Sequence, residues 1–301
     1  MSLHLNEIID IYEQSRPWYD EKPYPKTTRK VTGLKDCLEN VDLVLLDSYG
    51  VLCRGSEVIP QALSAIAELR QKGVAFCVVS NDTMNGWRTV EQKYQKLGFD
   101  FSADEIVTSL DVAEKFLEKQ QGQSSFAATC YGNNPIAGKF PQIADLNTTA
   151  GILPKNAENL MYLVGATWDD DLQKNLVESA QGVQNVYLAN PDVGAPSGDV
   201  FVKTPGFYAH DFYNKTNHNR PPILLGKPAA CMFEYALEFM GYQGKAENVL
   251  MVGDTLHTDI LGANNMGFQT LLVESGLFIE GEAEHYIQKT GIKPNFMAPT
   301  L

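Results

Sequence analysis

The sequence lacks the features that mark membrane, secreted and nucleic-acid-binding proteins. No stretch reaches the roughly 18 consecutive apolar residues that a membrane span needs, and the first residues do not form a signal sequence. With 24 Lys and Arg against 37 Asp and Glu, the net charge of -13 offers no broad basic surface for nucleic acid or anionic lipid. We therefore expect a cytoplasmic protein without nucleic-acid or membrane partners.

Cysteine is also sparse. The five cysteines stand far apart, and no pair has the Cys-x-x-Cys spacing of a zinc or redox site. This spacing argues against both a structural zinc and a disulfide framework. We interpret the cysteines as small core residues in a reducing compartment.

Apolar runs alternate with amphipathic helical patterns from Val41 onward. The runs include LVLL, VAFCVV, NVYLA, VLMVGD and TLLV, and the helical patterns cover about residues 60–72, 87–97, 109–121, 170–181 and 229–240. Continuous apolar strands that alternate with helices are typical of a parallel sheet with both faces covered. We therefore predict an α/β fold whose core is a Rossmann-like, doubly wound parallel sheet.

The middle of the chain is richer in Asn, Gly and Pro than its flanks. Strands followed by polar motifs lie before and after this region, so we predict that residues 122–220 form an inserted α/β domain. The core would then consist of residues 36–121 and 221–301. Residues 1–35 combine a short helical pattern with the segment RPWYDEKPYP, which indicates an extension packed on the surface.

The run VLLDSYGVL places Asp47 at the end of an apolar strand, and Gly50 closes the turn that follows. A carboxylate there suits a nucleophile or metal ligand, because parallel sheets bind ligands at their carboxyl edge. Alternatively, Asp47 only terminates the strand in a turn. Tyr49 is the next residue expected to face outward.

Three further apolar strands are followed by polar residues: Ser80-Asn81-Asp82, Lys227, and Asp254 with Asp259. The carboxyl ends of neighbouring parallel strands converge on one crevice, so these side chains could meet. Each could instead be a helix cap or a solvated strand-end lysine. Four such strand ends together favour a common site.

Carboxylates, a hydroxyl and a lysine in one crevice suit phosphoryl transfer through Mg²⁺. Asp47 would attack phosphorus in line and form an aspartyl phosphate, while Mg²⁺ held by Asp47 and Asp254 neutralises the nonbridging oxygens. Lys227 and Ser80 would hold the phosphoryl group. Magnesium takes about six oxygen ligands, several of them water, so two carboxylates and one backbone carbonyl suffice.

These residues resemble the four motifs of the haloacid dehalogenase (HAD) superfamily. In motif order they are Asp47 in LLDSYGVL, Ser80 in VVSND, Lys227 in LLGKP, and Asp254 with Asp259 in VGDTLHTDI. The phrases TSLDVAEKFL, LANPD and LGKPAACMFEYAL are similar to the nitrophenyl-phosphatase or NagD-type branch. The resemblance covers about residues 36–280.

The resemblance implies a Mg²⁺-dependent hydrolase, with residues 122–220 as a large α/β cap and a small phosphorylated metabolite as substrate. Ser80, Asn81 and Lys227 would bind that substrate. The Tyr49 backbone carbonyl would complete a metal site with Asp47 and Asp254, supported by Asp259. Related caps often pair, so a homodimer is a further expectation.

Tyr49 departs from the family pattern. Phosphatases of the superfamily carry a second aspartate there, which protonates the leaving alcohol and later activates water. A tyrosine hydroxyl, with an ordinary pKa of about 10, is a poor base near neutrality. General acid–base catalysis contributes about 10²–10⁴-fold, so an unreplaced loss predicts a slow phosphatase.

Several explanations of Tyr49 stay open from the sequence. The chain could be a dehalogenase-like hydrolase that attacks carbon, or a phosphometabolite-binding protein with little turnover. Alternatively, Asp82, His257 or Asp192 supplies the proton. Tyr49 itself could take a catalytic role or simply be an aromatic residue packed under the cap.

Overall fold

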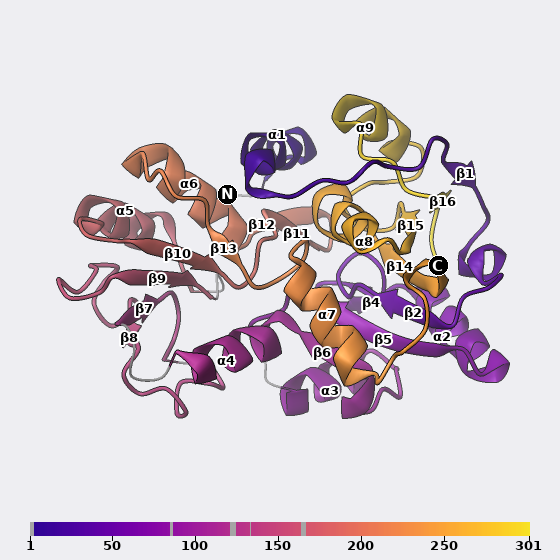
Figure 1. Cartoon of the computed structure of the whole chain (residues 1–301), viewed down its shortest axis with the longest axis horizontal. Coiled ribbons are helices and arrows are strands. Elements are labelled where there is room, and N and C mark those ends of the chain that lie inside the picture. Colours follow the sequence, from indigo (N-terminus) through magenta and orange to yellow (C-terminus); the bar gives the residue numbers. More distant parts are fainter. Residues whose placement is uncertain (1–2, 85–86, 121–124, 133, 164–166) are drawn as a thin grey trace.

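The computed structural model describes residues 3–84, 87–120, 125–132, 134–163 and 167–301 (Figure 1). Within these ranges, the main sheet has seven strands in the order β1-β16-β15-β14-β2-β5-β6, and every pairing is parallel. Their bounds are Arg29–Lys30 (β1), Leu43–Leu46 (β2), Ala75–Ser80 (β5), Ile106–Thr108 (β6), Val249–Gly253 (β14), Gln269–Val273 (β15) and Phe296–Ala298 (β16).

Helices cover both faces of the main sheet, because its central strands are apolar on both sides. In β2, Val44 and Leu46 join a core cluster with residues of α2, whereas Leu43 and Leu45 join another with residues of α4 and α7. The helix bounds are Pro60–Lys72 (α2), Trp87–Lys96 (α3), Ser109–Lys119 (α4), Ala230–Phe239 (α7) and Leu261–Met266 (α8). The predicted doubly wound α/β fold is confirmed, and these helices lie where the sequence pattern predicted helices, except for α8.

A second parallel sheet has the strand order β13-β10-β9-β7-β8. Its strands are Phe126–Ala128 (β7), Ala144–Asp145 (β8), Asn159–Tyr162 (β9), Asn185–Leu188 (β10) and Ile223–Leu224 (β13), and helices α5 (Asp170–Ser179) and α6 (Pro205–Thr216) belong to the same part of the chain. Figure 1 shows this layer beside the main sheet. The expected boundary between residues 121 and 122 lies outside the described residues.

The position of strand β13 differs from the prediction. The sequence placed the ILL run before Lys227 in the sheet that carries Asp47, but Leu224 pairs with Leu188 of β10 at the edge of the second sheet. The paired segment is only two residues long, and the chain then returns to the main sheet. Lys227 therefore reaches the carboxyl edge from a connecting segment, and its strand does not belong to the main sheet.

Two antiparallel hairpins complete the described strands. One pairs Gly194–Ser197 (β11) with Val200–Lys203 (β12), and we refer to residues 194–203 as the roof hairpin. The other pairs Cys53–Arg54 (β3) with Glu57–Val58 (β4). Arg54 joins the two hairpins, because its Nε donates a hydrogen bond to the Gly198 carbonyl at 3.1 Å.

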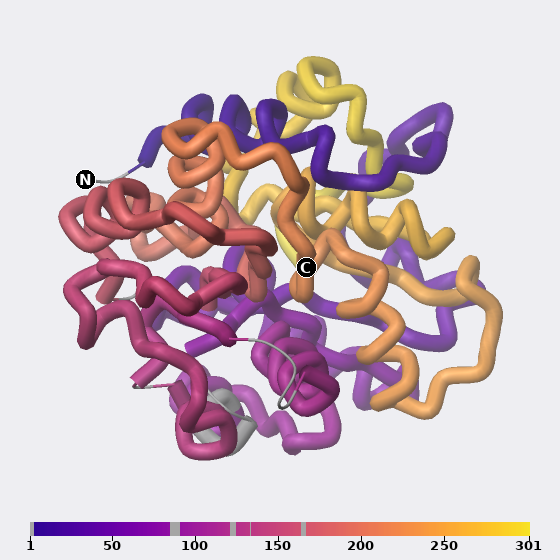
Figure 2. Tube along the Cα trace, turned by 60° about the vertical axis from the view of Figure 1, so that its left-hand side comes forward, coloured from indigo at the N-terminus to yellow at the C-terminus, as the bar shows by residue number. Residues whose placement is uncertain are grey.

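The N-terminal segment crosses both layers. Helix α1 (Leu5–Ser15) lies between α6 and α9 (Ala283–Thr290), as Figures 1 and 2 both show. Its residues Ile8, Ile9 and Tyr12 are buried, and β1 then adds an edge strand beside β16. Among the described helices, none is both long and apolar enough to cross a membrane.

Candidate active site

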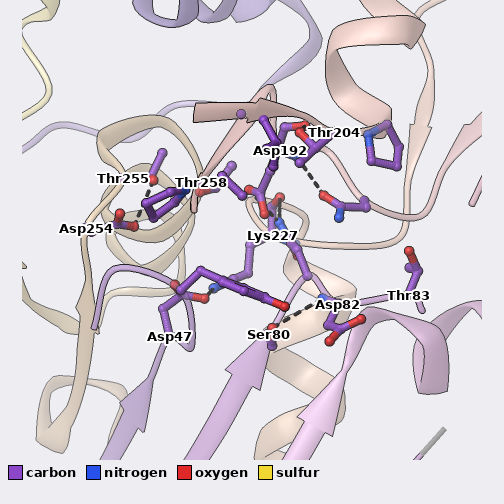
Figure 3. Close-up of a pocket in the computed structure, with 18 of the residues that line it drawn as sticks. Asp47, Ser80, Asp82, Thr83, Asp192, Thr204, Lys227, Asp254, Thr255 and Thr258 are labelled. Carbon is purple, nitrogen blue, oxygen red and sulfur yellow. Dashed lines mark hydrogen bonds and ion pairs between the residues drawn. The ribbon is translucent and has the colours of Figure 1, made fainter. Parts of the chain in front are cut away.

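A cavity of about 390 Å³ opens at the carboxyl edge of the main sheet, under the roof hairpin (Figure 3). Strand ends, the segment before α7 and the roof hairpin all contribute to its lining. Every site residue predicted from the sequence lines this one cavity: Asp47, Tyr49, Ser80, Asn81, Lys227, Asp254 and Asp259.

Three carboxylates form the floor of the cavity. Asp47 follows β2 and Asp254 follows the neighbouring β14, and the Asp47 N–H donates to the Val252 carbonyl at 2.9 Å. One carboxylate oxygen from each of Asp47, Asp254 and Asp259 lies within 4.8 Å of the other two. Oxygen ligands this close together fit a single hard divalent cation.

A π-helix, Leu256–Ile260, brings Asp259 back toward Asp254. The Thr255 N–H donates to Asp259 Oδ2 at 3.1 Å, and the Thr255 hydroxyl donates to Asp254 Oδ1 at 3.0 Å. The Leu277 N–H donates to Asp254 Oδ2 at 2.7 Å. These bonds hold both carboxylates in place before any ligand binds.

Gly50 is required where the turn after Asp47 approaches Asp254. Its φ is +87°, and a Cβ at this position would overlap the Asp254 carboxylate. The expected tight turn after Asp47 therefore also makes room for the second carboxylate.

Lys227 is the buried cation of this group. Its Nζ lies 2.5 Å from Asp47 Oδ1 and 2.8 Å from Asp259 Oδ1. Burial alone would lower the pKa of Lys227, but the carboxylates of Asp259, Asp47 and Asp192 raise it above its ordinary value. Lys227 therefore stays charged and offsets part of the negative charge.

The acid cluster still carries more negative charge than Lys227 neutralises. Burial and the carboxylates of Asp47 and Asp259 raise the pKa of Asp254 well above its ordinary value. Burial, opposed by Lys227, raises the pKa of Asp259 to about 6. A cation at the floor would relieve this repulsion.

Asn81 ties three segments together behind the cavity. Its Oδ1 accepts the Lys227 N–H at 2.8 Å, and its Nδ2 donates to the Lys227 carbonyl at 3.1 Å and to Asp192 Oδ1 at 3.0 Å. Ser80 lies beside it, and its hydroxyl accepts the Asp82 N–H at 3.2 Å. Asn81 thus fixes Lys227 and Asp192 relative to the end of β5.

Tyr49 lies against a second, partly buried ammonium. The Nζ of Lys93 lies 3.9 Å from the centre of the Tyr49 ring and 3.7 Å from Asp82 Oδ2. Burial raises the pKa of Tyr49 further above its ordinary value, although Lys93 opposes this shift. The Tyr49 hydroxyl therefore stays protonated near neutral pH.

The candidate proton donors differ in position. Asp82 and Asp192 both line the cavity, whereas His257 is not among the described lining residues. His257 is fully buried, its Nε2 lies 2.7 Å from Glu13 Oε1, and its ring stacks on Tyr12. His257, a candidate proton donor from the sequence, is thus covered by the N-terminal helix and does not face the cavity.

Two features around the cavity were missed from the sequence. Lys93 has no distinguishing signal, because it lies in a polar helix and its contact with Tyr49 depends on tertiary packing. The roof hairpin has a weak signal that could have been used. The turn residues Ser197-Gly198-Asp199 precede VFVK, a short run of β-branched and aromatic residues that is typical of a strand.

Two family models match this chain. Residues 44–137 match a model described as haloacid dehalogenase-like hydrolase, and residues 224–301 match one described as HAD-hydrolase-like. An acid sugar phosphatase of Staphylococcus aureus is 30% identical over 237 residues, which cover 77% of this chain and 86% of that protein.

Solved structures share most of this fold. A possible sugar phosphatase of the HAD superfamily from Cytophaga hutchinsonii gives a TM-score of 0.75 at 23% identity, covering 91% of this chain and 98% of that one. NagD from E. coli K-12 gives 0.65 at 20% identity, covering 86% and 96%. The expected likeness to a capped, NagD-type fold is confirmed.

Proposed function

Because the chain belongs to the haloacid dehalogenase-like hydrolases, we propose that it is a Mg²⁺-dependent phosphatase. Its substrate would be a small phosphorylated metabolite, hydrolysed through an aspartyl-phosphate intermediate. One observation carries the proposal: a buried Lys227 lies 2.5 Å from Asp47, in a cavity floored by three carboxylates. A nucleophile, a cation site and a phosphoryl-binding ammonium therefore lie within one cavity.

Asp47 is the proposed nucleophile. Its backbone is fixed by the bond to Val252, and its carboxylate faces the cavity (Figure 3). Lys227 and Ser80 would hold the phosphoryl group, because their ammonium and hydroxyl line the same cavity as Asp47. Asn81 would support this binding by fixing the Lys227 backbone. Attack by one carboxylate oxygen on phosphorus then needs no movement of the protein backbone.

Asp47, Asp254 and the Tyr49 carbonyl would hold Mg²⁺, and Asp259 would support them. The close carboxylate oxygens and the raised pKa values of Asp254 and Asp259 fit this assignment. When bound, the cation neutralises charge on the nonbridging phosphate oxygens. The Tyr49 side chain is not needed for this contribution, because its backbone supplies the ligand.

The cavity supports a small substrate. Its volume of about 390 Å³ is limited by the roof hairpin, and Thr83, Asn190, Ser197 and Thr204 add polar groups away from the acid cluster. Such a lining suits a hydroxylated phosphate ester, in agreement with the name of the Staphylococcus relative. We also propose the domain division given above, except that β13 (Ile223–Leu224) would belong to the cap and not to the core.

A turnover screen tests the function. The full chain with Mg²⁺ is expected to release inorganic phosphate from a panel of sugar, polyol and nitrophenyl phosphates, and EDTA should stop the release. Asp47→Asn removes the nucleophile but keeps its size, and should lower kcat by at least about 10³-fold. Chloride release from haloacids instead of phosphate release would contradict the proposal. Ester binding without either product would indicate a binding protein.

A further inference from the structure

Tyr49 leaves the proposed phosphatase without the usual proton donor. Its hydroxyl is a weak acid, and burial raises its pKa further. The carboxylates of the acid cluster are committed to Lys227 and to the proposed cation. Among the described residues that line the cavity, two other carboxylates remain as candidates: Asp82 and Asp192.

Asp82 is poorly placed to transfer a proton. Its Oδ1 accepts the Met84 N–H at 2.8 Å, and its Oδ2 is occluded from solvent and lies 3.7 Å from Lys93 Nζ. Asp82 therefore offers no open oxygen to a ligand in the cavity.

Asp192 has the opposite properties. Its Oδ1 accepts the Asn81 Nδ2–H at 3.0 Å, whereas no hydrogen bond to its Oδ2 occurs among the described residues. Buried side-chain oxygens that lack a partner have been identified among the described residues, and Asp192 Oδ2 is not one of them, so this atom is not fully buried. The side chain is half-buried and lines the cavity, so this oxygen is open to a ligand.

The position of Asp192 fits departure of the leaving group. In Figure 3, Asp47 and Asp192 enter the cavity from opposite sides, and Lys227 is labelled between them. An in-line displacement expels the leaving oxygen on the side of phosphorus opposite the attacking oxygen. A proton donor across the cavity from Asp47 is therefore on the side where the alcohol leaves.

The backbone of Asp192 is held from three directions. Its N–H donates to Asn190 Oδ1 at 3.0 Å, and its carbonyl accepts the Thr204 hydroxyl. The N–H of the next residue, Val193, donates to the Tyr12 hydroxyl at 3.1 Å. The carboxyl group is thus positioned before substrate binds, as acid–base catalysis requires.

Asp192 also has a suitable protonation equilibrium. Burial raises its pKa to about 7, with smaller contributions from Asp47 and Asp259 and opposition from Lys227. A group that titrates near neutrality can both donate and accept a proton at working pH. This property supports the assignment, which stands on the position and the open oxygen.

We propose that Asp192 is the general acid and base of this enzyme, in place of the aspartate that Tyr49 replaces. The proposal rests on the phosphatase function given above. As Asp47 Oδ bonds to phosphorus, the bond from phosphorus to the ester oxygen breaks, and that oxygen takes the Asp192 proton and leaves as the alcohol. The Asp192 carboxylate then accepts a proton from water, whose oxygen displaces Asp47 and completes inorganic phosphate.

Leaving-group dependence tests this role. An alkyl phosphate needs a protonated leaving oxygen, whereas p-nitrophenolate leaves readily without one. Asp192→Asn should lower kcat/KM for glycerol phosphate by about 10²–10⁴-fold and that for p-nitrophenyl phosphate by less than about tenfold. Asp192→Glu, which keeps the carboxyl group, should recover part of the alkyl-ester activity.

Asp82→Asn is the matched control, because it changes the other lining carboxylate and should leave the ratio between the two esters unchanged. Equal losses on both esters in Asp192→Asn, or no loss, would overturn the role of Asp192 alone. The same conclusion would follow if Asp82→Asn showed the selective loss. If the wild-type chain released no phosphate from any ester, the phosphatase function would fail, and the role of Asp192 with it.

Discussion

Three buried carboxylates share the floor of the cavity with the ammonium of Lys227. At the scale of single residues, this imbalance makes the site costly to maintain without a cation. The pKa of Asp254 is raised well above its ordinary value, and that of Asp259 is raised to about 6. A raised carboxyl pKa means that the folded protein resists ionisation more than the unfolded chain does.

Stability without divalent cations should therefore fall as pH rises from about 4 to 6. In this window the folded protein binds more protons than the unfolded chain, so the free energy of unfolding decreases with pH. Asp254→Asn removes one of the charges and should raise the free energy of unfolding in EDTA at pH 7 by about 1–3 kcal/mol. Urea denaturation at several pH values measures both effects.

The same variant should lose the stabilisation that Mg²⁺ gives the wild-type protein, because one proposed ligand is missing. Asp42, an exposed aspartate, provides a control, since Asp42→Asn should keep the Mg²⁺ response. A wild-type protein whose thermal unfolding is unchanged by millimolar Mg²⁺ would contradict the cation assignment.

At the scale of elements, the roof hairpin limits the cavity opposite the acid cluster. Arg54 joins it to the main-sheet side through the Gly198 carbonyl at 3.1 Å and the carbonyls of Ser275 and Gly276, each at 3.3 Å. A charged donor shared among three carbonyls holds the hairpin tip over the cavity. Hydrogen bonds therefore hold the roof hairpin over the site.

Arg54→Met should loosen this hairpin without touching the reacting groups. We expect KM for a sugar phosphate to rise about 3–10-fold, because a charge-assisted hydrogen bond contributes about 1.5–3 kcal/mol and exposure weakens it. The value of kcat should change less. Arg54→Lys keeps the charge but not the forked geometry, so its KM should lie between that of the wild-type protein and that of Arg54→Met. A fall in kcat with constant KM would indicate a direct role in the chemistry.

How far the sequence predicts an element depends on where its stabilising contacts lie. Apolar runs such as Leu43–Leu46 carry their own signal, because they are buried on both faces, and α2 begins and ends at the predicted residues. Strand β13 was placed in the wrong sheet, since two residues do not encode their partner. The π-helix that turns Asp259 inward is likewise set by contacts with Thr255 and Lys227.

The candidate site likewise contains residues that the sequence predicts and residues that it does not. Residues at strand ends are predictable, because the parallel sheet fixes where they point. Lys93 and the N-terminal cover over His257 are not, because each depends on a contact between distant segments: α3 with the turn after β2, and α1 with the π-helix. Asp192 was one of three proton donors open from the sequence, and the structure separates it from His257 by position.

At the scale of the whole molecule, the N-terminal segment joins the two layers. The Leu3 N–H donates to the Phe201 carbonyl of the roof hairpin at 3.0 Å, and the Tyr12 hydroxyl accepts the Val193 N–H. On the core side, Tyr12 stacks on His257, and the Tyr286 hydroxyl of α9 donates to Asn6 at 2.8 Å. This short N-terminal segment thus contacts both layers.

Tyr12→Phe tests this junction with a change of one atom. The buried Val193 N–H would lose its acceptor, so we expect a loss of about 1–3 kcal/mol in the free energy of unfolding and faster amide hydrogen exchange at Val193. Tyr24→Phe is the matched control, because the Tyr24 hydroxyl bonds to Glu21 at the surface. Equal, small effects in both variants would show that the contact does not join the layers.

The position of α1 also sets an order of events during synthesis. The helix precedes its partners Val193, Phe201, His257 and Tyr286 by a long stretch of chain, and such a separation slows the formation of contacts. The apolar side chains of Ile8, Ile9 and Tyr12 therefore stay unburied until these later segments have been synthesised.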